Sequence, residues 1–152
     1  MTINPNADKH ISPTGEAFIR GFESCKLLAY KDYQDKAGNW VYSIGYGHSH
    51  VDKDLLINQD QADAFLDQDL KDREKIARNL ITVALNQNQW DSVISTLYNV
   101  NMIEFREYAA ALNTADFDKA MNKLLEFDKS NGKQLRGLTR RRQAEAKMFR
   151  GG

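Results

Sequence analysis

The chain has 152 residues, and 41% of them are hydrophobic, which is enough for one compact domain or two small lobes that share a core. Its 21 Lys and Arg residues balance its 21 Asp and Glu residues, so the net charge gives no support for a polyanionic partner such as nucleic acid. The single cysteine, Cys25, excludes an intrachain disulfide, and no apolar run approaches the ~20 residues that insertion across a membrane requires.

The N-terminal part is predicted to be a polar leader followed by a short helix. Residues 1–11 are expected to be flexible, and they lack the basic start and apolar stretch of a signal peptide. Ser12 and Pro13 are suited to the N-cap and the first position of a helix. An apolar stripe at helical spacing follows, and Glu23 lies beside it near the expected end of the helix.

The next segment is predicted to form a small sheet. Between Leu28 and Tyr46, runs rich in Tyr, Trp, Val and Ile flank a Gly-Asn pair, which favours strands joined by turns. Asp35–Gly38 is the expected turn. Gly45 and Gly47 indicate tightly turned backbone after the second run.

The remainder of the chain is predicted to be helical. Asn58–Gln61 and Asn86–Gln89 each place Gln three residues after a cap residue, which predicts capping boxes. The second precedes a nearly continuous apolar stripe, so its helix is expected to be the most buried. Thr114 and Thr139 are predicted to cap two later helices, and Asn131-Gly132 to end the first of these. The pattern predicts an α+β fold, predominantly helical, with the strands near one end.

Two carboxylates and a hydroxyl lie close together in the sequence where the first helix gives way to the hairpin: Glu23, Asp32 and Ser43. Hydrolysis of a sugar acetal needs a proton donor for the leaving oxygen and a second carboxylate that activates water or attacks the sugar. Ser43 is suited to hold the attacking water through its hydroxyl. On its own, however, a Glu on a short helix is more often a solvated surface residue.

The residues around these groups resemble the signature of phage-type lysozymes, the muramidases of glycoside hydrolase family 24. That signature has Phe-Glu-Gly, then Ala-Tyr-x-Asp, then Thr-Ile-Gly-Tyr-Gly-His after a hairpin of variable length. The resemblance runs in order from about Ile11 to Phe149. The matching segments are Phe22-Glu23-Ser24, Leu27–Asp32, Ser43–His48, Ile57–Ala62 with Asp69-Leu70, Leu85–Asp91 with Tyr98–Val100, and Gly137–Glu145.

The resemblance implies a role for each matching position. Glu23 corresponds to the catalytic glutamate, Asp32 to the aspartate that activates or orients water, and Ser43 to the hydroxyl residue, which is usually Thr. His48 corresponds to a histidine just beyond the site that supports it. An arginine of the last helix, with Arg141 as the central choice, is expected to hold the position of the catalytic glutamate.

Three aromatic side chains of the expected sheet, Trp40, Tyr42 and Tyr46, are candidates for a sugar-binding groove. Aromatic residues on strands are more often part of a core, so both interpretations stay open.

Two features leave the assignment of the site open. Replacing Thr by Ser43 keeps the hydroxyl but removes the methyl group that restrains its rotamer, so a less firmly held water is expected. The ten residues between Asp32 and Ser43 also allow Asp35 to be the second carboxylate, because short-hairpin relatives have Asp-x-x-Gly in this region. Asp32 is preferred, because the segment Ala29–Asp32 fits the signature.

The implied fold is lysozyme-like and two-lobed. A catalytic N-terminal lobe with a small β-hairpin sheet is expected over 12–57, a connecting helix over 58–80 and a helical lobe over 81–152. The implied reaction is hydrolysis of the β-1,4 bond between N-acetylmuramic acid and N-acetylglucosamine with inversion. No cofactor is expected, and the pair of histidines at His48 and His50 lacks a clear third ligand for a metal.

The implied partner is the glycan strand of bacterial peptidoglycan. A monomer made in the bacterial (host) cytoplasm without a signal peptide is expected, acting on the cell wall either as a phage endolysin released through a holin or as an antibacterial effector with an immunity protein. Two other functions stay open: a non-catalytic peptidoglycan-binding module on the same fold, and a lytic transglycosylase, which typically needs only one acid.

Overall fold

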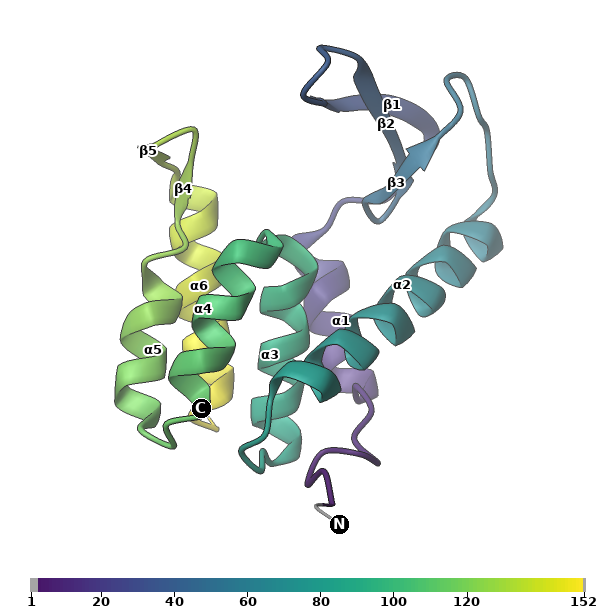
Figure 1. The fold of residues 1–152 in the computed structure, drawn as a ribbon. Helices are drawn as coiled ribbons and strands as arrows, with labels where there is room; N and C mark the ends of the chain where they lie inside the picture. The colour runs from purple at the N-terminus through teal and green to yellow at the C-terminus, as the bar shows by residue number, and fades with distance from the viewer. Residues whose placement is uncertain (1–2, 152) are drawn as a thin grey trace. The chain divides into compact units, whose positions relative to one another are not determined.

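The computed structural model describes residues 3–151, which form six helices and two antiparallel sheets (Figure 1). None of the described helices has both the length and the hydropathy needed to cross a membrane. In chain order the elements are α1 (Pro13–Phe22), β1 (Lys26–Gln34), β2 (Trp40–Gly45), β3 (His48–Val51), α2 (Gln59–Leu80), α3 (Gln87–Asn99), α4 (Met102–Leu112), α5 (Phe117–Leu125), β4 (Lys129–Ser130), β5 (Lys133–Gln134) and α6 (Arg136–Phe149). The predicted α+β class, mostly helical with the strands of the main sheet early in the chain, is confirmed.

The chain divides into two compact units. The sheet unit is Ala17–Asp72, and the helical unit joins the chain up to Glu16 to the part from Arg73 onward. These bounds differ from the expected 12–57, 58–80 and 81–152, because both α1 and α2 run from one unit into the other. Residues 59–72 of α2 belong to the sheet unit, and residues 73–80 belong to the helical unit.

The sheet unit is built on an antiparallel sheet in the order β1-β2-β3. The β1–β2 hairpin closes through the predicted turn, in which Gly38 has a φ of +84°. Ile44 of β2, Ile57 and Ala62 of α2 form a buried cluster within this unit. The predicted capping box at the start of α2 is present, because Asn58 and Gln61 each accept a hydrogen bond from the other's backbone N–H at 2.8 and 2.9 Å.

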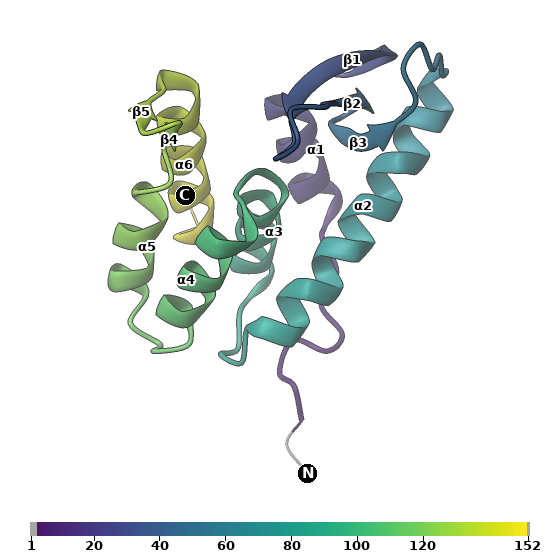
Figure 2. The same ribbon diagram turned by 45° about the horizontal axis from the view of Figure 1, so that its top comes forward.

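The helical unit has α3 as its most buried helix, as its apolar stripe predicted. Asn86 caps α3 in a capping box with Gln89, and all residues from Trp90 to Leu97 are buried. Within this unit α3 packs against α6, and α5 lies beside both α4 and α6 (Figures 1 and 2).

Three expectations about helix ends are wrong. Asp116, not Thr114, caps α5. Helix α6 begins at Arg136, before Thr139, and its N-cap residue Leu135 makes no side-chain capping bond. Asn131-Gly132 does not end a helix but forms the turn between β4 and β5, with φ of +51° and +75°. Consecutive positive φ angles suit the tight turns of two-residue hairpins, for which Asn-Gly is a strong signal.

The segment expected to be a flexible leader makes specific hydrogen bonds to the helical unit through Asn4 and Asn6; residues 1 and 2 lie outside the described part. Asn6 is fully buried, donates to the carbonyl of Val83 at 2.8 Å and accepts from the N–H of Leu85 at 3.1 Å. Asn4 donates to the carbonyl of Arg78 at 2.8 Å. These two asparagines therefore attach the segment to the helical unit.

Candidate active site

Glu23 lies directly after the last turn of α1. Its backbone N–H still donates to the carbonyl of Ile19 at 2.9 Å, which continues the hydrogen bonding of the helix. The side chain is half-buried, and an ideal Cβ built on Gly47 would stand 3.7 Å from Glu23 Oε2. Gly47 has a φ of +92°, a conformation that L side chains rarely adopt. The Gly-x-Gly turn between β2 and β3 thus lies against the carboxylate of Glu23.

Asp32 occupies a bulge in β1. The pairing of β1 with β2 advances from Lys31↔Tyr42 to Tyr33↔Val41, so Asp32 is an extra residue without a partner. Bulges redirect side chains and are frequent next to active sites. The Asp32 side chain accepts a hydrogen bond from Ser43 Oγ at 2.6 Å. The structure therefore brings together two of the three residues that the sequence selected.

The Ser43 hydroxyl makes two side-chain contacts in the structure. The residue is fully buried, and its only proton is donated to Asp32. A second hydroxyl, that of Ser49, lies 3.1 Å from Ser43 Oγ. Ser43 therefore orients a carboxylate, and its predicted contact with the attacking water stays a prediction.

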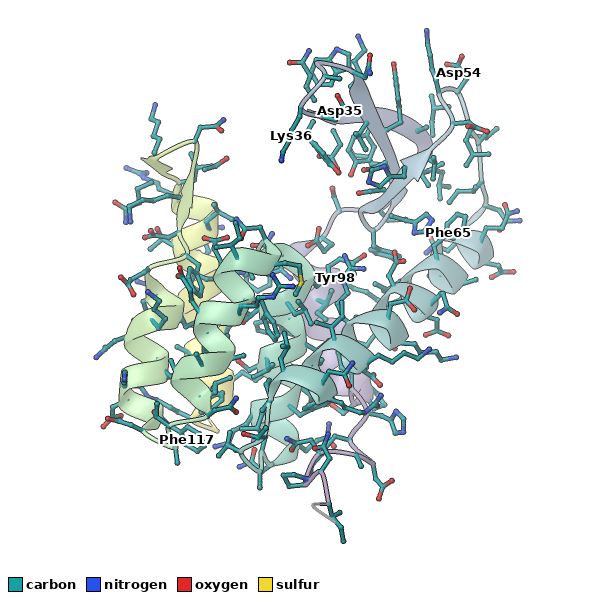
Figure 3. The ribbon with its side chains drawn as sticks, in the orientation of Figure 1. Asp35, Lys36, Asp54, Phe65, Tyr98 and Phe117 are labelled. Atoms are coloured by element: carbon teal, nitrogen blue, oxygen red, sulfur yellow. The ribbon has the colours of Figure 1, made fainter. Side chains whose placement is uncertain are left out.

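Asp35, the alternative second carboxylate, stabilises the turn of the hairpin. Its Oδ1 accepts from the backbone N–H groups of Ala37 and Asn39, both at 2.9 Å. This arrangement is an Asx-type turn, and Asp35 lies at the outer end of the β1–β2 hairpin beside Lys36 (Figure 3). The structure joins Ser43 to Asp32 and gives Asp35 a separate task.

His48 connects β3 to α2. Its Nδ1 lies 2.8 and 3.1 Å from the two carboxylate oxygens of Asp69. Its ring stacks on Phe65 with the centroids 4.2 Å apart and an interplanar angle of 6°, and Figure 3 labels Phe65 on α2. Both contacts fix the strand that follows the Gly-x-Gly turn, which fits the supporting role implied for His48.

Tyr46 is engaged in a polar cluster within the sheet unit. Its hydroxyl accepts from Arg20 at 3.0 Å and from Gln59 at 3.1 Å. The same two side chains donate to Asp63, each at 2.8 Å, and these hydrogen bonds hold the pKa of Asp63 below its ordinary value. The Arg20 guanidinium also lies 4.9 Å from the centre of the Tyr46 ring. These contacts join α1, the turn and α2, so the described partners of Tyr46 are structural.

Trp40 and Tyr42 project from β2 with different exposure. Trp40 is 45% exposed, and the ammonium of Lys31 lies 5.3 Å from the centre of its ring. Tyr42 is half-buried. Trp40 thus offers a large accessible aromatic surface of the kind on which a sugar ring can pack.

Arg141 lies on α6 in the helical unit and is 3% exposed. It donates to Glu145 at 3.2 Å and to the carbonyl of Ser95 at 3.1 Å. Glu23 belongs to the sheet unit, so a contact between Arg141 and Glu23 stays a prediction. The contacts with Glu145 and Ser95 orient the Arg141 guanidinium within the helical unit.

Tyr30 lies next to the candidate site and is not among the residues that the sequence predicts for it. It pairs with Ser43 across the β1–β2 ladder and lies two residues before Asp32. Burial raises the pKa of the Tyr30 hydroxyl, and the negative charges of Asp32 and Glu23 raise it further. Both carboxylates therefore act electrostatically on one phenol. The sequence signal for this residue is its place in Ala29-Tyr30-Lys31-Asp32, the segment that matches the family signature.

The arrangement supplies acid–base chemistry. A half-buried carboxyl and a carboxylate oriented by a buried hydroxyl are the groups that hydrolysis of an acetal requires. Within residues 3–151, no group of three His, Cys, Asp or Glu side chains is placed to hold a metal ion.

Comparisons with known proteins find relatives that are named endolysins. The endolysin of Acyrthosiphon pisum secondary endosymbiont phage 1 is 37% identical over 147 residues, which cover 92% of this chain and 97% of that endolysin. The endolysin of Bacillus phage B103 is 33% identical over 144 residues. This alignment covers 92% of the present chain but 54% of the Bacillus phage protein, so the chain spans about half the length of that relative.

Solved structures give the same result. The muramidase domain of SpmX from Asticaccaulis excentricus superposes with a TM-score of 0.79 at 28% identity, covering 93% of this chain and 98% of that domain. A mutant lysozyme of phage P22 superposes with a TM-score of 0.73, also at 28% identity and with the same coverage of both chains.

The family model described as phage lysozyme matches residues 20–145. This range spans most of the chain and includes Glu23, Asp32, Ser43, His48 and Arg141. The chain therefore belongs to the phage lysozyme family.

Proposed function

We propose that this chain hydrolyses the β-1,4 bond between N-acetylmuramic acid and N-acetylglucosamine in bacterial peptidoglycan, with Glu23 as the general acid and Asp32 as the group that activates water. Membership of the phage lysozyme family makes it a lysozyme-type peptidoglycan hydrolase, and its relatives are named endolysins. The single observation that carries the assignment of roles is the 2.6 Å hydrogen bond from Ser43 to Asp32.

Glu23 is suited to protonate the leaving oxygen. Its side chain is half-buried at the end of a helix, and its carboxylate lies beside a glycine that leaves it room. A positioned acid of this kind contributes typically 10²–10⁴-fold to the rate. Arg141 is proposed to hold the position of the Glu23 carboxyl, as the family resemblance implies.

Asp32 is suited to receive a proton from water. Its side chain is exposed, while the bulge and the Ser43 hydroxyl fix its direction. One carboxylate oxygen is committed to Ser43, which leaves the other free to accept from the attacking water. Ser43 acts on the reaction through Asp32, since it is buried and its proton is already donated.

The proposed reaction proceeds with inversion. In an inverting enzyme one carboxyl protonates the leaving oxygen while the other activates a water on the opposite face of the sugar, and the two groups stand ~6.5–9.5 Å apart to make room for that water. Trp40 and Tyr42 are proposed to contact the sugar rings, and His48 to keep the turn after β2 in place.

The test is hydrolysis of purified peptidoglycan by the intact chain and by Glu23→Gln, with the new ends identified by mass spectrometry and the first anomer formed followed by NMR. New N-acetylmuramic acid reducing ends of inverted configuration, lost by at least about 10²-fold in the variant, are expected. Anhydro-sugar ends would indicate a lytic transglycosylase. Binding without cleavage by the intact chain would leave a glycan-binding module.

A matched pair of variants separates the two candidate aspartates. Asp32→Asn keeps an oxygen that can accept from Ser43 but removes the charge and the basic site, so the rate should fall by at least about 10²-fold. Asp35→Asn keeps the oxygen that accepts the two turn hydrogen bonds and should leave the rate unchanged. The reverse result would assign the second carboxylate to Asp35.

A further inference from the structure

A second bulge, in β3, determines which residue faces Ser43. The pairing of β2 with β3 shifts between Tyr42↔Val51 and Ser43↔Ser49. If the first register continued, Ser43 would face His50. Instead His50 is the extra residue, with a φ of +65°. Its ring Nε2 lies at hydrogen-bond distance, 3.3 Å, from the Tyr33 hydroxyl. The bulge thus places the Ser49 hydroxyl beside Ser43.

The three groups form a directed chain of hydrogen bonds. Ser43 has one hydroxyl proton, and Asp32 takes it at 2.6 Å. In the 3.1 Å contact between the two serine hydroxyls, Ser49 must therefore be the donor. The other acceptor within reach of Ser49 is the carbonyl of Gly47 at 3.5 Å, which is at the limit of hydrogen-bond distance. The nearer acceptor is favoured, so protons point from Ser49 to Ser43 to Asp32.

This series of hydrogen bonds restrains the rotamer of Ser43, which a serine side chain does not do by itself. A serine side chain has three staggered rotamers, whereas the second branch of a threonine removes some of them. Ser43 can donate to Asp32 only while its oxygen points toward β1. A donor on the opposite side, from β3, stabilises that orientation because it binds the lone pair that the same rotamer presents.

We propose that Ser49 is a positioning residue for hydrolysis: its hydroxyl holds Ser43 in the rotamer that donates to Asp32, in place of the restraint that a threonine methyl would give. The proposal rests on the proposed function of Asp32 as the group that activates water. Ser49 itself contacts neither reacting atom in this proposal.

The first consequence concerns the rate. Ser49→Ala removes the donor and should lower kcat by about two- to tenfold, which corresponds to the loss of one ordinary hydrogen bond, with little change in KM. Ser49→Thr keeps the hydroxyl and should retain activity. Ser130→Ala, which alters an exposed serine on β4, is the matched control and should match the unmodified chain.

The decisive measurement is rescue by a second substitution. Ser43→Thr restores a rotamer restraint at the position that Ser49 acts on, so adding it to Ser49→Ala should recover most of the lost kcat, while thermal melting reports whether each variant is folded. Equal kcat for Ser49→Ala and the unmodified chain would overturn the proposal, as would a loss that Ser49→Thr shares. If added bulk at the buried position 43 prevents folding, Ser49→Thr alone still decides the case.

Failure of this proposal is distinguishable from failure of the proposed function. The assay uses soluble peptidoglycan fragments and the intact chain. An intact chain without hydrolytic activity contradicts the proposed function. An active chain in which Asp32→Asn abolishes turnover but Ser49→Ala does not slow it contradicts only the role of Ser49.

Discussion

Glu145 is expected to be the charged side chain whose loss lowers the stability of the helical unit most. It is fully buried on α6 and interacts with Arg141 and Arg142, which are 3% and 0% exposed. Its Oε2 accepts from Ser95 Oγ at 2.5 Å and from both guanidinium groups at 3.2 Å, and its Oε1 lies 2.7 Å from Arg142 Nε. Burial lowers the pKa of Arg142, and the Glu145 charge opposes that effect.

The perturbation is Glu145→Gln, which keeps the shape but removes the charge. Breaking a buried ion pair by neutralising one partner costs about 3–5 kcal/mol, because the other charge stays in a low-dielectric environment. Two buried arginines share this one carboxylate, so a cost at the upper end of that range is expected. For a chain of this length 1 kcal/mol shifts Tm by about 2–4 °C, so Tm should fall by roughly 10 °C or more.

The assay is urea unfolding followed by tryptophan fluorescence. Trp90 is fully buried in α3, and the chain has two tryptophans. In a Trp40→Phe background the fluorescence therefore comes from Trp90 and reports unfolding of the helical unit. The control is Glu107→Gln, whose carboxylate is 52% exposed and lies 3.5 Å from Lys123, since exposed ion pairs contribute little. A loss below about 1 kcal/mol for Glu145→Gln, or one no larger than that of Glu107→Gln, would refute the reasoning.

Two further predictions test the sheet unit and the N-terminal segment. Asp32→Asn should lower the pKa of Tyr30 toward its ordinary value, and Glu23→Gln should lower it less, because Asp32 has the larger of the two charge effects. NMR titration of the tyrosine ring carbons measures the pKa of Tyr30 in each variant. An unchanged pKa of Tyr30 in Asp32→Asn would contradict the placement of the Asp32 carboxylate. Asn6→Ala should cost about 1–3 kcal/mol of unfolding free energy, since it leaves two backbone groups of the α2–α3 connection without their partner. Hydrolysis by the folded Asn6→Ala chain should continue, and a free energy equal to that of the unmodified chain would mean that the segment is only loosely attached.

The sequence predicted those parts of the fold and site that are encoded locally. The caps at Asn58 and Asn86 were found because the reciprocal hydrogen bonds span only three residues. Glu23, Asp32 and Ser43 were selected because their motifs are contiguous. The family model matches residues 20–145, a range that contains all three.

What the sequence could not predict depends on pairing at a distance. The bulges at Asp32 and His50 exist only as a mismatch between two strands, so neither strand alone reveals them. The hydrogen-bond partners of Asn6 lie 77 and 79 residues away along the chain. The polar composition of residues 1–11 alone therefore predicted a solvated segment. Asn131-Gly132 carries signals for both a helix end and a hairpin turn, and the pairing of β4 with β5 decided between them.

The role of Ser43 follows from a count of protons that only the structure permits. A serine hydroxyl has one proton, so it can hold a carboxylate or donate to a water, but not both at once. With its proton on Asp32 and Ser49 as its donor, Ser43 has no proton left to donate to the substrate water. The lack of a threonine methyl at position 43 then affects how firmly the Asp32 carboxylate is oriented. The two bulges are the backbone features that allow the buried Ser43 to orient it.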